Sequence, residues 1–192
     1  MGLTFLMPTL AVHLKKFGYS TVYIGFCFGI PTLCYALAST FVFKFTECMR
    51  KRTVIYIGLS IMSLSLFMIG PSSWIGFDRE DIFILIGLSL LGVSGGMIII
   101  PVMPEMIEAV EKDHRFHYDE DELNENISGM FVAAQGIGET LGPVLGSVLA
   151  STYGFDNSQD IIGAYVSVFL MAYIIFCGRY LCVRRHKHKN EN

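Results

Sequence analysis

Residues 136–146 read Gly136-Ile-Gly-Glu-Thr-Leu-Gly-Pro-Val-Leu-Gly146, within an apolar stretch, 127–152, that is long enough to cross a bilayer. The glycines recur at the spacing of a helix face, and close contact between helices in lipid depends on such small residues. The run also carries a carboxyl, Glu139, which is costly in hydrocarbon unless it faces water or a partner. The sequence therefore predicts a tightly packed membrane helix that holds one functional carboxyl.

The composition of the whole chain is that of an integral membrane protein. Hydrophobic residues make up 53% of its 192 residues and charged residues only 16%. Its mean hydropathy is +0.52, which is high for a soluble domain. The sequence has no basic patch typical of nucleic-acid binding, and no set of residues typical of an enzyme, a cofactor site or a metal site. The five cysteines form no Cys-x-x-Cys pair, and we interpret them as reduced packing residues.

The distribution of apolar residues predicts a single all-α transmembrane domain over residues 1–192. We expect a polytopic membrane helix bundle of five transmembrane helices plus a partial one. The partial helix covers residues 1–14, which are apolar but too short to span, as in a truncated helix. The predicted spans are 22–43, 53–70, 82–104, 127–152 and 161–183.

The basic residues predict the orientation of the chain. Three segments that would share one side of the membrane hold eleven of the fourteen Lys and Arg residues: Lys44–Arg52, the acidic loop 105–125 and the tail after Gly178, including the basic segment 184–192. The positive-inside rule then makes this side, and the C-terminus, cytoplasmic. The acidic loop is interpreted as a solvated segment, with a regulatory or docking role as the alternative, and its first residues are expected to form a short interfacial helix.

Several residues are candidates for helix packing and gating because they are small, or are prolines, at helical spacing. Gly25 and Gly29 share a narrow face with Thr32 in the first full span. In the fourth span the stripe includes Gln135 and Glu139, so we expect both polar side chains on the glycine face. The packing and gating candidates are Gly25, Gly29, Gly138, Gly142, Pro143 and Gly146.

The polar candidates for a proton or substrate pathway are Glu139, Gln135, Tyr35 and Thr32. Two interpretations of Glu139 are open. It is either a protonated carboxyl hydrogen-bonded to a neighbouring helix, or a group that exchanges a proton or pairs with a cation as the site opens to each side. Tyr35 is either a ring for a cation–π contact or a packing residue.

The spacing Gly138-x-x-x-Gly142-Pro143-x-x-Gly146 resembles the antiporter signature of the major facilitator superfamily, in the form found in its eleventh helix. The resemblance extends over nearly the whole chain. It looks most like the vesicular amine transporter and drug:proton antiporter branch in Phe5-Leu-Met-Pro8, Phe17-Gly18-Tyr-Ser and Pro101-Val-Met-Pro104-Glu105.

This resemblance implies a chain that corresponds to the C-terminal six-helix half of a twelve-helix fold, with substrate bound between the two halves. It also implies a partner, either the missing N-terminal half or a second chain. In the cytoplasmic gating loop, which in the family has the form Gly-x-x-x-Asp-Arg, Glu47, Arg50 and Arg52 keep the charges, whereas Phe43 and Cys48 replace the glycine and the first arginine. Glu139 does not coincide with the aspartate of the amine transporters' eleventh helix, so its role rests on its position in the membrane alone.

Two functions of different classes follow. The first is a secondary active transporter, or the C-terminal half of one, that exchanges a small organic solute, with a cation as one option, for protons by alternating access. The alternative is a degenerate, non-transporting membrane protein that acts as a structural or accessory subunit, which the short first helix and the altered loop at Phe43 and Cys48 favour. The expected partners are the lipid bilayer, the solute, protons and the second half.

Overall fold

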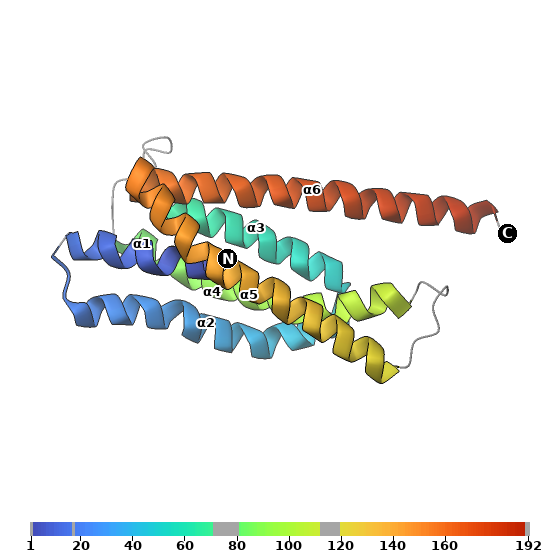
Figure 1. The fold of residues 1–192 in the computed structure, drawn as a ribbon. Helices are drawn as coiled ribbons and strands as arrows, with labels where there is room; N and C mark the ends of the chain where they lie inside the picture. The colour runs from blue at the N-terminus through green and yellow to red at the C-terminus, as the bar shows by residue number, and fades with distance from the viewer. Residues whose placement is uncertain (1, 17, 71–80, 112–119, 191–192) are drawn as a thin grey trace.

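The computed structural model describes residues 2–16, 18–70, 81–111 and 120–190, and these residues form helices joined by short connections (Figure 1). The described residues contain no strand, which confirms the predicted all-α class. The helices are α1 (Gly2–Lys16), α2 (Thr21–Cys48), α3 (Lys51–Ile69), α4 (Asp81–Glu111), α5 (Glu120–Tyr153) and α6 (Phe155–Asn190).

The helices pack as a bundle around α4. The main contacts of α4 are with α3 and α2, and α6 covers α3 on the side away from α4 (Figure 1). The fifth helix packs against α1 and, less extensively, against α6. Much of α5 and one side of α2 are therefore left without a neighbouring helix from the described chain.

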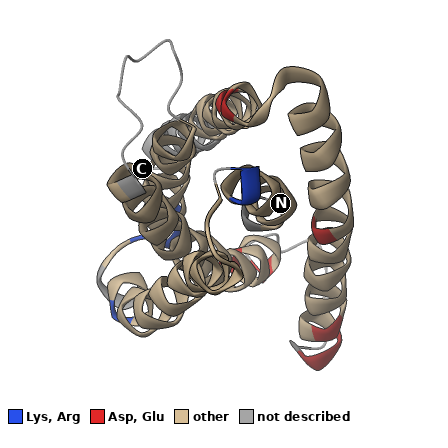
Figure 2. Cartoon of the chain, turned by 90° about the vertical axis from the view of Figure 1, so that its left-hand side faces the viewer, with Lys and Arg blue, Asp and Glu red and all other residues tan. Residues whose placement is uncertain are grey.

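Four helices of the described chain are long and apolar enough to cross a membrane, over Thr21–Thr46, Lys51–Ile69, Ile82–Glu111 and Phe155–Phe176. Figure 2, an end-on view, shows that most of the ribbon carries neither acidic nor basic residues. The expected fifth span, 127–152, lies within α5, which has 34 residues but is not among the four. Its glycines, hydroxyl residues, Gln135 and Glu139 make it less apolar than the other long helices.

The helices extend beyond the predicted spans. Residues 105–111, expected in the acidic loop, continue α4 beyond Pro104, and α5 already begins at Glu120. Only 112–119 of that loop lie between the two helices, outside the described residues. The basic segment is helical as far as Asn190, as the end of α6. Apolar content marks the part of a helix that lipid covers, whereas backbone hydrogen bonds continue into water, so a span and its helix end at different residues.

Two of the connections between helices are short turns that contain a glycine with positive φ. Gly18 has a φ of 79° between α1 and α2, and Gly154 has a φ of 82° as the single residue between α5 and α6. This left-handed region is costly for residues with a Cβ atom. Ser20 ends the connection between α1 and α2 and caps α2, because its side chain accepts a hydrogen bond from the Tyr23 amide at 3.3 Å.

Close helix contacts are made through glycine, as the small-residue argument predicts for lipid. A Cβ atom added to Gly92 of α4 would lie 2.2 Å from the carbonyl oxygen of Pro31 in α2. One added to Gly146 of α5 would lie 2.7 Å from the carbonyl oxygen of Phe5 in α1. Side chains fill the remaining space in a core shared by α1, α2, α3, α4 and α6: Leu6, Leu10, Leu14, Cys27, Leu66, Ile69, Leu88, Leu91, Phe155 and Val166.

Candidate functional site

Glu139 and Gln135 form a polar pair one helical turn apart on α5. The Gln135 side-chain amide donates a hydrogen bond to the Glu139 carboxyl at 2.9 Å. Both side chains are exposed on a surface that the described helices leave uncovered. The pair holds the carboxyl in one position along the helix, where a proton or a cationic group can approach it from outside this bundle.

Pro143 leaves a second polar group available next to this carboxyl, the backbone carbonyl of Glu139. Proline has no N–H, so the Glu139 carbonyl, four residues earlier, lacks its usual donor within the helix. The nearby Thr140 hydroxyl donates to the carbonyls of Gly136 and Ile137 at 3.1 and 3.0 Å. Glu139 therefore supplies both a carboxyl and a released carbonyl on one stretch of α5.

The glycines of α5 lie on a face adjacent to that of the polar pair. Gly138, Gly142 and Gly146 are buried, whereas Gln135 and Glu139 are exposed. We expected one shared face. Successive residues turn by about 100° on a helix, so Glu139 falls beside the glycine stripe, and α1 covers only the glycine side.

The candidates on α2 lie on an open face. A Cβ atom added to Gly25 or Gly29 would meet no atom within 4 Å, so neither glycine packs helices together within the described chain. Thr32 is exposed and its hydroxyl donates to the Phe28 carbonyl at 3.3 Å, while Tyr35 is half-buried. The structure does not bring α2 against α5, because α2 packs mainly on α4.

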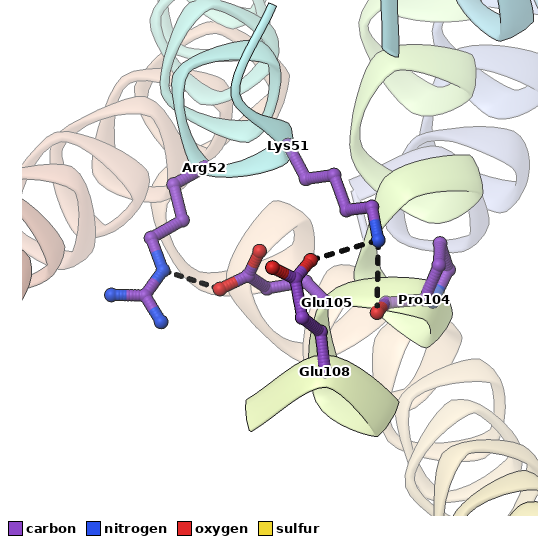
Figure 3. A network of polar contacts seen from close by, with 5 residues as sticks. All are labelled: Lys51, Arg52, Pro104, Glu105 and Glu108. Carbon is purple, nitrogen blue, oxygen red and sulfur yellow. Dashed lines mark hydrogen bonds and ion pairs between the residues drawn. The ribbon is translucent and has the colours of Figure 1, made fainter. Parts of the chain in front are cut away.

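An ionic network joins the start of α3 to the end of α4 (Figure 3). Lys51 Nζ lies 2.9 Å from the Glu108 carboxylate and donates to the Pro104 carbonyl at 3.4 Å. Arg52 Nε donates to the Glu105 carboxylate. All four charged side chains are partly exposed. The network fixes the part of α4 that follows Pro104, where the helix lacks a backbone donor.

The expected gating-loop residues have different positions. Arg52 belongs to the network, whereas Arg50 is exposed and precedes α3 without a side-chain capping hydrogen bond. The side chain of Glu47 lies outside the described part. The acids that pair with the loop, Glu105 and Glu108, were not among the predicted site residues. Their spacing of three residues after Pro104, on the side expected to hold the basic run, was the available signal.

Among the described residues, no group of three or more His, Cys, Asp or Glu side chains is placed to hold a metal ion. The polar pair of α5 and the ionic network offer proton uptake, charge pairing and hydrogen bonding.

These features define a class: a polytopic helical membrane protein in which one helix of the bundle, α5, carries a hydrogen-bonded carboxyl on an open face. The model of the Major Facilitator Superfamily matches residues 1–192, and the chain belongs to this family. The resemblance seen in the sequence is thereby confirmed.

Similar proteins share a part of their length with this chain. The MFS-type transporter SLC18B1 of Rattus norvegicus is 30% identical over 178 residues, which are 90% of this chain and 38% of that protein. The proteins of the same name from Mus musculus and Homo sapiens are 29% identical over 166 and 195 residues, which cover 84% and 98% of this chain and 35% and 41% of theirs. The chain thus spans well under half the length of these relatives. No solved structure matches it.

Proposed function

We propose that this chain forms the C-terminal half of a secondary active transporter that exchanges a small organic solute, with a cation as one option, for protons. The observation that carries the proposal is Glu139, held by Gln135 on an open face of α5, in a chain of the major facilitator superfamily. A carboxyl within the membrane-crossing part of a bundle is costly to keep charged and unpaired, so it favours a functional role.

The chemistry of this site suits proton exchange. A carboxyl can accept a proton when it faces one side of the membrane and release it when it faces the other. In its charged form it pairs with a cation, and the Glu139 carbonyl released by Pro143 offers a further acceptor to an ammonium group. Thr32 and Tyr35 of α2 are proposed as further residues of the pathway, since the first is exposed and the second half-buried.

The open faces of α2 and α5 suit a second half-bundle. Cβ atoms added to Gly25 and Gly29 of α2, or to Gly129 and Gly136 of α5, would meet no atom within 4 Å. Such faces allow another helix to approach closely. We propose that an N-terminal half, or a second chain, packs there and that the solute binds between the two halves, which rock about it.

The ionic network provides an orientation and a gate. The end of the bundle with Lys51 and Arg52 is proposed to be cytoplasmic, together with the C-terminus. Arg52, with Glu47 near the end of α2 and Arg50 just before α3, is proposed to act in cytoplasmic gating through its pairing with Glu105.

The test is uptake driven by a pH gradient into proteoliposomes that contain the complete transporter. Glu139→Gln keeps the size of the side chain but removes its titration, and we expect it to abolish the dependence of uptake on the gradient. Glu122→Gln is the matched control, because this exposed acid lies in the first turn of α5, outside the predicted span. Uptake by Glu139→Gln with unchanged rate and pH dependence would refute the coupling role.

The accessory function makes a different prediction. A non-transporting subunit gives no uptake with any of a panel of organic cations and neutral solutes, even when the complete protein is correctly inserted. The accessory function is refuted if one solute is taken up and if this uptake is lost when the pH gradient is dissipated.

A further inference from the structure

A ring contact joins two helix ends that are distant in the sequence. The ring of His13, in the last turn of α1, lies 4.1 Å from the ring of Phe155, the first residue of α6, with an angle of 25° between their planes. Phe155 is 9% exposed and His13 is half-buried. The transport chemistry proposed above does not use this contact.

We propose that His13 makes α1–α6 packing sensitive to pH, with protonation of its imidazole strengthening the contact with Phe155. Histidine changes charge near neutral pH without any special environment. An imidazolium is attracted to the face of an aromatic ring more strongly than a neutral imidazole is. The position of His13 adds to this effect, because the last turn of a helix favours a positive charge.

Charged groups on α1 and α6 act in opposite directions. Lys15 and Lys16 follow His13 on α1 and oppose a further positive charge, but both are exposed and their effect is screened by water. Asp156 and Asp160 lie in the first two turns of α6, and one carboxylate oxygen of each is buried. Both carboxylates lie on the helix that His13 contacts, and charges interact more strongly where water is partly excluded than at an exposed surface.

The other helices packed against α1 add no positive charge among their described residues at this end. The last residue of α5 is Tyr153, Tyr23 lies in the first turn of α2, stacked on Tyr19, and α4 begins at Asp81. Phenols are uncharged over the range in which histidine titrates. His13 is therefore the described group of this junction whose charge changes between pH 5.5 and 7.5 on ordinary values.

A second contact keeps the helices together when His13 is neutral. The Gln159 amide of α6 lies 3.5 Å from the Thr9 hydroxyl of α1, and both residues are buried. Neither group titrates. Protonation of His13 therefore adjusts the strength of a junction that is already assembled. This proposal does not depend on transport by the chain.

The first test is geometric. In the full chain in detergent micelles, with histidine labelled at the ring Cε1 position, the His13 proton signal is expected to be shifted by the ring current of Phe155. Phe155→Leu keeps an apolar side chain and should return the signal to the position of an ordinary histidine, and His13→Gln identifies the signal. An unshifted His13 signal in the wild-type chain would overturn the proposal.

The second test is the pH dependence of thermal stability. The apparent melting temperature of the wild-type chain, relative to His13→Gln, is expected to rise by about 2 to 4 °C between pH 7.5 and pH 5.5. His186→Gln, which removes a histidine from the far end of α6, should keep the wild-type pH dependence. If His13→Gln has the same pH dependence as the wild-type chain, His13 is not the sensor. That comparison holds even if Phe155→Leu fails to fold.

Discussion

Gly92 and Pro31 bring α4 and α2 together backbone against backbone. A Cβ atom at Gly92 would lie 2.2 Å from the Pro31 carbonyl oxygen and 2.9 Å from the carbonyl carbon. Backbone atoms cannot turn aside as a flexible side chain can. No side chain other than hydrogen fits at position 92 unless the two helices separate.

Gly92→Ala is therefore expected to destabilise the bundle, by about 1 to 3 kcal/mol or more, as overpacked cores do. Gly29→Ala is the matched control, because it faces open space in α2 and should stabilise its helix by about 0.5 to 1 kcal/mol. Unfolding in mixed detergent micelles measures both changes. Equal stabilities of the two variants would contradict the close crossing of α2 and α4.

Arg52 and Glu105 are expected to stabilise the α3–α4 end by a modest coupling energy. Their side chains are 30% and 19% exposed, so water screens the pair, and we expect about 0.5 to 1 kcal/mol at low salt. A double-mutant cycle with Arg52→Gln and Glu105→Gln measures this energy. The same cycle on Lys51 and Glu108, with Glu108 at 38% exposure, should give a smaller value. Coupling that does not weaken in high salt would argue against an ionic contact.

Ser63 and Ser167 form a hydroxyl pair between α3 and α6. Their oxygens are 2.6 Å apart, and the Ser63 hydroxyl also lies 3.4 Å from the Gly163 carbonyl. Polar contacts between membrane helices contribute about 0.6 kcal/mol on average and up to about 1.7. Ser63→Ala should lower the free energy of unfolding of the bundle by an amount in this range.

The matched control for this pair is Ser60→Ala. The Ser60 hydroxyl donates to the Tyr56 carbonyl at 2.9 Å, a hydrogen bond within α3 itself. Its removal should change the free energy of unfolding very little. A loss as large as that of Ser63→Ala would show that the helix itself, and not the α3–α6 contact, is responsible.

Pro143→Ala is expected to separate stability from transport. The alanine N–H can donate to the Glu139 carbonyl, so α5 should become more stable, by up to about 3 kcal/mol. If the released carbonyl contributes to the site, uptake driven by a pH gradient should fall in the same variant. Val144→Ala, an exposed neighbour, controls for a change of volume nearby. Unchanged uptake would remove the carbonyl from the proposed site.

Much of this fold was predictable because apolar length determines where helices cross a membrane. The spans 22–43 and 82–104 lie inside α2 and α4, and the span 53–70 passes the end of α3 by one residue. The last glycine of 138–146, Gly146, lies in close contact with Phe5 of α1. The helix ends were not predictable from the same signal. Charged residues such as Glu108 continue a helix in water as readily as they would form a loop.

Contacts between residues far apart in the sequence could not be predicted from it, for a different reason. Periodicity shows which residues share a helix face but not which neighbour covers that face. The partners of Arg52 and of His13 lie 53 and 142 residues further along the chain. The position of Glu139 beside, rather than on, the covered face of α5 depends likewise on where α1 packs.

Gly154, the single residue between α5 and α6, bears on how the protein enters the membrane during its synthesis. The sixth helix is long and apolar enough to cross a membrane over Phe155–Phe176, whereas α5, with its carboxyl and glycines, is not among the helices with that property. A one-residue link forces the two into an antiparallel hairpin as soon as both are made. The insertion machinery would then receive α5 and α6 as one hairpin. The more apolar α6 would carry the less apolar α5 into the bilayer with it.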